Sequence, residues 1–81
     1  MKITLDMRSD TVTLPPDGMR KAIAEAQLGD DFYHDDPTVK KLEAKAAAML
    51  GKEAALLVLS GTMGNLVSVM SQAKPGTEAI V

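Results

Sequence analysis

AALLVLSGTMGN, residues 54–65, is the stretch of sequence that decides the fold. Its first half, residues 54–59, is an unbroken apolar run, which is typical of a strand buried on both faces in a parallel sheet. After the second half, an apolar stripe at helical spacing predicts a helix over about residues 63–73; the stripe consists of Leu66, Val69, Met70 and Ala73. A buried strand that leads into a helix predicts an α/β fold, with helices flanking the start of a mainly parallel sheet.

The residues that follow extend this pattern. Pro75-Gly76 predicts a turn, and EAIV at 78–81 indicates the beginning of another buried strand. The order strand, helix, strand implies a right-handed crossover. Because the sequence stops inside this last element, we expect residues 1–81 to be the N-terminal fragment of an incomplete domain.

The residues before the apolar run predict extended chain and then a helix. In residues 2–14, Ile3 and Leu5 alternate with polar neighbours and a β-branched run follows at residues 11–13, and Pro15-Pro16 ends any strand. Asp17 is a candidate capping residue for a helix over about residues 17–27. Gly29 follows this helix, at a place where a left-handed cap is common.

An acidic loop and a second helix complete the pattern. Residues 29–36, GDDFYHDD, have no apolar period and predict an exposed loop. Asp36-Pro37 is a helix-start signal, so we expect a helix over residues 37–50 that Gly51 ends. One face of this helix is apolar (Val39, Leu42, Ala46, Met49 and Leu50), and Lys40, Lys41, Glu43 and Lys45 lie mostly on the other face.

Composition limits the functions open to the chain. Its 81 residues are 46% hydrophobic but only 2% aromatic, with no cysteine, so they favour part of a larger core over a self-sufficient small one. The net charge of −2 comes from interspersed acids and bases, which argues against nucleic-acid binding. No apolar run reaches about 18 residues and no signal-peptide region is evident, so we expect a cytoplasmic protein without a membrane segment.

SGTMGN at 60–65 is the strongest candidate for a ligand site. A helix start presents unpaired N–H groups and about half a positive charge, so it binds phosphate readily. Gly61 and Gly64 would let the backbone approach an anion, and the hydroxyls of Ser60 and Thr62 can add hydrogen bonds. The spacing matches neither a Walker loop nor the dinucleotide fingerprint. On the local pattern alone, an ordinary strand-to-helix turn capped by Ser60 or Thr62 stays open.

Two further polar clusters carry weaker signals. Arg8-Ser9-Asp10-Thr11 could hold an amino-acid substrate, but a solvated strand end with an Arg–Asp surface pair explains it as well. The acidic loop lacks the ligand spacing and closing Glu of a calcium hand. His34 is the only histidine, which excludes a zinc site built from several histidines and leaves serine–histidine catalysis without support. We therefore assign no metal ligand and no catalytic residue.

Four segments together resemble the low-specificity threonine aldolases. These segments are MRSDTVT (7–13), GDDFYHDDPTV (29–39), GKEAALLVLSGTMGN (51–65) and the PGTEAIV ending, in the order and approximate spacing of that family. The family consists of fold-type I pyridoxal-phosphate lyases in the β-eliminating lyase group. The resemblance implies a pyridoxal 5'-phosphate cofactor, retro-aldol cleavage of a β-hydroxy-α-amino acid such as L-threonine to glycine and an aldehyde, and a homotetramer with active sites between subunits.

The resemblance also assigns roles to residues of this chain. Ser60, Gly61 and Thr62 match the turn that grips the cofactor phosphate. Ser9 matches a serine that helps bind the substrate carboxylate, and Tyr33 matches a tyrosine near the active-site entrance. His34 stands where the family pattern has glycine, and Phe32 where a smaller apolar residue is usual. If position 34 needs a positive φ, histidine is among the better non-glycine residues there, at some cost.

The resemblance further implies that essential groups lie beyond residue 81. These are the histidine that stacks on the cofactor ring, the lysine that forms the Schiff base and the arginine that clamps the substrate carboxylate. None of the seven lysines of this chain matches the Schiff-base position. We therefore expect residues 1–81 alone to be inactive. Two alternatives stay open: a non-catalytic α/β module that oligomerises, and another fold-type I lyase that acts on a different amino acid.

Overall fold

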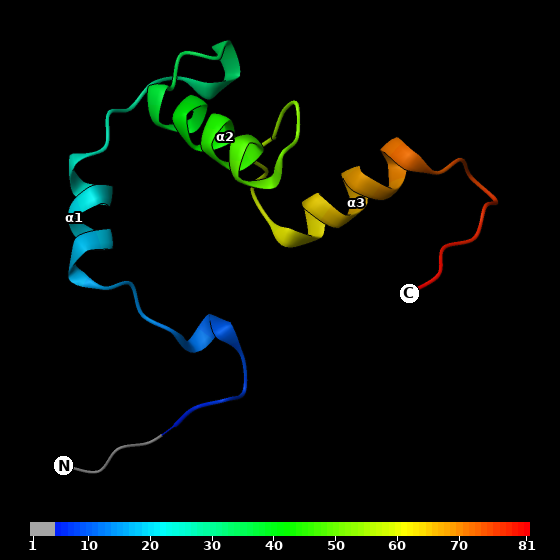
Figure 1. The fold of residues 1–81 in the computed structure, drawn as a ribbon, viewed down its shortest axis with the longest axis horizontal. Helices are drawn as coiled ribbons and strands as arrows, with labels where there is room; N and C mark the ends of the chain where they lie inside the picture. Colours follow the sequence, from blue (N-terminus) through cyan, green and yellow to red (C-terminus); the bar gives the residue numbers. More distant parts are fainter. Residues whose placement is uncertain (1–4) are drawn as a thin grey trace. The chain divides into compact units, whose positions relative to one another are not determined.

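The computed structural model describes residues 5–81, which divide into two compact units between Thr38 and Val39. The described elements are a 3-10 helix η1 (Asp10–Val12), α1 (Asp17–Glu25), a 3-10 helix η2 (Asp31–Tyr33), α2 (Pro37–Leu50) and α3 (Gly61–Gln72) (Figure 1). Residues 5–81 contain no strand. No helix within this range is both long and apolar enough to cross a membrane.

The first unit departs from the predicted extended start. Residues 10–12 form η1 rather than extended chain, because the Ser9 side chain accepts a hydrogen bond from the Thr11 N–H and caps a short turn. Ile3, which opened the predicted alternation, lies outside the described residues.

Helix α1 forms where it was predicted but differs at both ends. Pro16 occupies the N-cap position without a side-chain bond, so the prediction that Asp17 caps this helix is wrong. Asp17 is instead the first helical residue, where its charge suits the positive end of the helix dipole. The helix ends at Glu25, two residues early, and Gly29 is not in the left-handed region.

Helix α2 confirms the prediction for residues 37–50, and its end is explained by one glycine. The Asp36 side chain accepts a hydrogen bond from the Thr38 N–H at 2.9 Å, which fixes the start of the helix. Gly51 has a φ of 63°, a left-handed conformation that ends the helix as predicted. Ala47 is the one buried residue among residues 5–81, at 8% exposure, so most of the predicted apolar face is uncovered.

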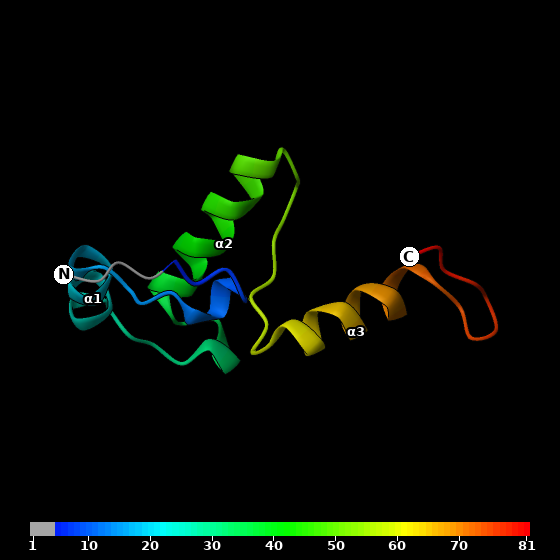
Figure 2. The ribbon, with the colours of Figure 1, turned by 90° about the horizontal axis from the view of Figure 1, so that it is seen from below.

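The predicted strand over residues 54–59 is not confirmed. The chain turns back after α2 and runs along that helix to α3 without forming a ladder (Figure 2). Leu56 is 71% exposed and Leu59 is 96% exposed. Residues 78–81, the second predicted strand, are also irregular and exposed. A parallel sheet is stable only with several paired strands, and the described residues supply helices but no second strand.

Helix α3 and the turn after it form where the sequence predicts a helix and a turn, although the bounds of the helix differ. The helix covers Gly61–Gln72, so it begins two residues before the predicted start at 63. Gly76 has a φ of 86°, and the Thr77 N–H donates to the Lys74 carbonyl at 3.2 Å, which confirms the turn at Pro75-Gly76. The fold therefore places the candidate anion-binding turn at the first residues of a regular helix.

Candidate functional site

The turn at residues 60–62 has the backbone geometry of a helix start. Ser60 is extended, with φ −153° and ψ 159°, and its side chain accepts a hydrogen bond from the Met63 N–H at 3.0 Å. Its carbonyl accepts the first helical bond, from the Gly64 N–H, at 3.0 Å. This confirms the simpler reading of Ser60 as N-cap. It also leaves the N–H groups of Gly61 and Thr62 without a hydrogen-bond partner within residues 5–81.

The two glycines of the turn have different surroundings. A Cβ atom built on Gly61 would meet no atom within 4 Å, so the backbone there is open to an approaching ligand. A Cβ on Gly64 would lie 3.4 Å from Cγ2 of Val58, so this position faces the preceding segment of the chain. Openness to an anion is therefore a property of Gly61, whereas Gly64 packs over Val58.

This arrangement suits a phosphate or another small anion. Two N–H groups and the Thr62 hydroxyl stand at the start of a twelve-residue helix, whose dipole places about half a positive charge there. The first turn of α3 contains no acidic residue that would oppose an anion. Ser60, Gly61 and Thr62 thus come together in one turn, as the sequence predicts. Their predicted role in binding the cofactor phosphate stays a prediction.

Ser9 lies in the first unit and is engaged locally. Its Oγ accepts hydrogen bonds from the N–H and the hydroxyl of Thr11, at 3.2 Å and 3.0 Å, and its own hydroxyl can donate to Asp10 at 3.3 Å. Ser9 is nevertheless exposed, so its hydroxyl is accessible to solvent. Its predicted role at a substrate carboxylate stays a prediction.

Arg8 forms an ion pair with Asp6 rather than with the Asp10 of its own motif. The Arg8 Nε donates to the Asp6 carboxylate at 2.9 Å, and the Arg8 backbone N–H donates to it at 3.2 Å. These side-chain and backbone hydrogen bonds hold the pKa of Asp6 below its usual value. Both groups are exposed at the surface, so solvent screens the pair and it adds little to stability.

Tyr33 stands on a well-defined loop of the first unit. It ends η2, is 68% exposed and packs edge-on against Phe32, with ring centroids 4.9 Å apart. The next residue, His34, has φ 58° and ψ 34°, so position 34 is left-handed, as its place in a glycine position suggested. The loop thus displays both aromatic rings of the chain, and Tyr33 is accessible for the predicted contact near an active-site entrance.

The approach of two backbone segments fixes the base of this loop. A Cβ on Gly29 would lie 2.3 Å from the Asp35 carbonyl oxygen and 2.8 Å from Cα of Asp36, so only glycine fits. The Gly29 N–H donates to the Asp36 carboxylate at 3.4 Å, and the Thr38 hydroxyl donates to the Gln27 carbonyl at 2.6 Å. The glycine is required by this close approach and not by the helix cap that the sequence suggested.

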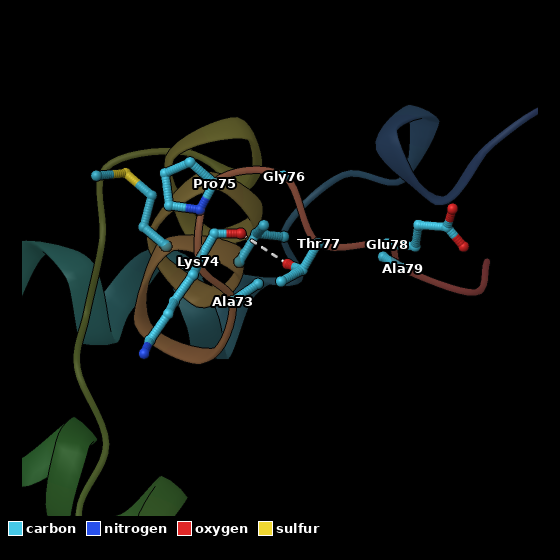
Figure 3. A pocket seen from close by; sticks show the side chains of 9 residues that line it. Ala73, Lys74, Pro75, Gly76, Thr77, Glu78 and Ala79 are labelled. Atoms are coloured by element: carbon cyan, nitrogen blue, oxygen red, sulfur yellow. Dashed lines mark hydrogen bonds between the residues drawn. The ribbon is translucent and has the colours of Figure 1, made fainter.

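A hollow of the second unit lies away from the turn at residues 60–62. A cavity of about 400 Å³ is formed where the chain folds back after α3, between Val69 and Ala79 (Figure 3). Its two charged side chains, Lys74 and Glu78, point in different directions, and the one bond drawn joins the Thr77 hydroxyl to the Lys74 carbonyl (Figure 3). The cavity lacks convergent polar groups, and residues 5–81 contain no cluster of three metal-binding side chains.

One polar contact near the turn was missed by the sequence analysis. The Glu43 carboxylate of α2 accepts a hydrogen bond from the Leu57 N–H at 2.8 Å. The helical pattern placed Glu43 on the polar face with the lysines, and no short-range signal links it to a residue 14 positions later.

Comparisons with known proteins give one consistent family. The family model of the beta-eliminating lyases matches residues 6–81. Low-specificity L-threonine aldolase 1 of Arabidopsis thaliana is 58% identical over 67 residues, 83% of this chain and 19% of that protein. The low specificity L-threonine aldolase of Escherichia coli K12 is 49% identical over 77 residues, 95% of this chain and 23% of that protein.

The similarity extends to fungi, where the low specificity L-threonine aldolase of Saccharomyces cerevisiae is 44% identical over 64 residues, 79% of this chain and 16% of that protein. The chain spans about a fifth of the length of the curated relatives it matches. No solved structure gives a significant match.

Proposed function

Because the chain belongs to the beta-eliminating lyase family, we propose that it forms the N-terminal part of a pyridoxal-phosphate-dependent threonine aldolase. The substrate would be a β-hydroxy-α-amino acid such as L-threonine, cleaved to glycine and an aldehyde. The observation that best supports the proposal is the open turn at the start of α3, which lies within the residues 6–81 that match the family.

The residues of this turn fit a cofactor phosphate. The N–H groups of Gly61 and Thr62 are available, the Thr62 hydroxyl stands beside them, and no side chain occupies the space at Gly61. Ser60 fixes the turn through its bond to Met63, so these donors are held in place before the anion arrives. When bound, pyridoxal phosphate supplies the electron sink that stabilises a carbanion at the α-carbon of the amino acid.

The first unit would contribute to substrate binding. We assign Ser9 to the substrate carboxylate and Tyr33 to the entrance of the active site, and both are supported by their exposure. We further propose a fold-type I domain in which residues 54–59 become a strand when neighbouring strands supply backbone partners. We also propose a homotetramer, as the family resemblance implies. The exposed apolar residues of α2 and α3 support this proposal, because other parts of the protein or other subunits would have to cover them.

The proposal is tested with purified protein that contains residues 1–81 together with the cofactor-anchoring lysine. We expect added pyridoxal phosphate to give a protein-bound absorption band, and L-threonine to yield glycine and acetaldehyde in equal amounts. The control is the cofactor without protein, since free cofactor reacts slowly with amines. A protein that binds the cofactor but cleaves no β-hydroxy-α-amino acid would redirect the proposal to another lyase reaction. A protein that does not bind it would refute the proposal.

A further inference from the structure

We propose that Phe32 is a specificity-determining residue, and that it favours amino-acid substrates with a bulky apolar or aromatic group on the β-carbon. The inference rests on the proposed function, which assigns Tyr33 to the entrance of the active site. The Phe32 ring lies directly against the Tyr33 ring, with centroids 4.9 Å apart and ring planes at 90°. A substrate group that reaches Tyr33 therefore also comes within reach of Phe32.

The conformation that presents the two rings is fixed within the loop itself. The Asp30 carboxylate accepts the Phe32 N–H at 2.9 Å, and the Asp30 carbonyl accepts the Asp35 N–H at 2.9 Å. At the base of the loop, Gly29 lies too close to the backbone of Asp35 to accommodate a Cβ atom. None of these contacts involves residues 54–59, so the strand pairing that we propose for the longer protein does not compete with them.

The arrangement of the two rings suits contact with a third apolar group. Phe32 and Tyr33 are both mostly exposed. In an edge-to-face pair, the edge of one ring meets one face of the other, so the remaining faces stay open. A large apolar substituent that packs on such a face removes more apolar surface from water than the methyl group of threonine can. The ring of Phe32 therefore discriminates between substrates by the size and flatness of their β-substituent.

The charges around the rings narrow the substrate class further. Residues 29–36 contain four aspartates and no lysine or arginine. Backbone N–H groups of Phe32 and Thr38 hold the carboxylates of Asp30 and Asp36 on the loop. A negatively charged β-substituent would be repelled by these carboxylates, whereas a neutral one would not. Aromatic faces surrounded by negative charge thus point to a neutral, apolar β-substituent.

The experiment compares wild type, Phe32→Val, Phe32→Leu and Leu28→Ala in protein that contains residues 1–81 and the anchoring lysine. Valine removes the ring and most of the bulk, whereas leucine keeps more of the apolar volume without a ring. Leu28→Ala is the control, because Leu28 is a largely exposed apolar residue just before the loop. The measured quantity is the ratio of kcat/KM for 3-phenylserine to kcat/KM for threonine. Misfolded or cofactor-free protein lowers both values equally, so the ratio reports on specificity alone.

We expect the ratio to fall about three- to tenfold in Phe32→Val, the change that corresponds to the loss of one aromatic contact. Phe32→Leu should fall less, because it keeps apolar volume, and Leu28→Ala should keep the wild-type ratio. An unchanged ratio in Phe32→Val, or an equal fall in Leu28→Ala, would overturn the inference while the cleavage of threonine still supports the proposed function. Wild-type protein that cleaves neither amino acid would refute both.

Discussion

At the scale of single residues, Gly61 offers a direct test of the anion site. In protein with the anchoring lysine, Gly61→Val places a branched side chain in open space, so the fold should survive. We expect pyridoxal phosphate affinity to fall roughly ten- to hundredfold, the equivalent of one hydrogen bond to a charged group. Equilibrium titration measures the change. Gly18→Val is the control, because Gly18 is also open and lies in α1. Wild-type affinity in Gly61→Val would reduce the turn to a structural feature.

Gly29 gives a second prediction at the residue scale, because its surroundings are crowded whereas those of Gly61 are open. Gly29→Ala would push a methyl group into the backbone of Asp35 and Asp36, so the loop must open. We expect Gly29→Ala to lower the free energy of unfolding by about 1–3 kcal/mol, as at other overpacked sites. Gly18→Ala meets no neighbour and should stabilise the protein by about 0.5–1 kcal/mol, because alanine is the better helix former. Chemical denaturation of the protein with the anchoring lysine measures both, and equal stabilities of the two variants would disprove the steric argument.

Residue-level predictions from the sequence succeeded where the chemistry is local. Ser60 as a cap and Gly51 as a helix end each depend on two or three neighbouring residues. The role of Gly29 could not be predicted, because it arises from a backbone segment six residues away. The bond between Glu43 and Leu57 was missed for the same reason, since it joins residues 14 positions apart.

At the scale of elements, substitutions of the N-cap residue Ser60 are expected to affect the stability of α3 and the binding of an anion differently. Ser60→Ala removes the acceptor for the Met63 N–H and should cost about 1 kcal/mol of stability. Ser60→Asp keeps an acceptor and adds a charge that favours the helix start. That same charge repels a phosphate. We expect Ser60→Asp to be as stable as wild type in denaturation experiments yet to bind pyridoxal phosphate more weakly. Tighter binding in Ser60→Asp would contradict an anion site at this turn.

The helices could be predicted from sequence and the sheet could not be confirmed, for a physical reason. A helix satisfies its backbone within four residues, so the apolar spacing around Leu42 and Leu66 was sufficient to place α2 and α3. A strand needs a second backbone beside it, and residues 54–59 have none within the described chain. The apolar run is therefore typical of a buried environment that residues 5–81 do not themselves provide.

At the scale of the whole molecule, the exposed apolar side chains predict the behaviour of the isolated 81-residue chain. Among residues 5–81 only Ala47 is buried, while Leu59, Met49 and Leu66 are largely exposed. A small chain with so little burial cannot offset its conformational entropy. We expect it to be molten, aggregated or oligomeric, and to lack a cooperative melt in calorimetry. A sharp transition from a species that sedimentation identifies as a monomer would prove this wrong.

The same 81 residues should lack aldolase activity. They contain the proposed phosphate turn and Ser9, but no lysine that matches the cofactor-anchoring position, so orientation of the reacting groups is missing. Glycine and acetaldehyde release from L-threonine should equal that of added cofactor alone. The preparation must have an intact mass of 81 residues, since longer protein would carry the missing groups. Turnover clearly above the control from such material would contradict the proposed division of roles.

The side-chain caps have a consequence for the time course of folding. Thr11, Phe32, Thr38 and Met63 each donate a backbone N–H to a side chain only two or three residues earlier. Loops this short close within about 100 ns, and helices relax within about 1 μs, so the starts of α2 and α3 are set almost at once. The proposed pairing of residues 54–59 with distant strands would take milliseconds or longer, as in proteins of high contact order. During that interval the most apolar segment of the chain is presented between two formed helices, and it is the place where a wrong partner would first attach.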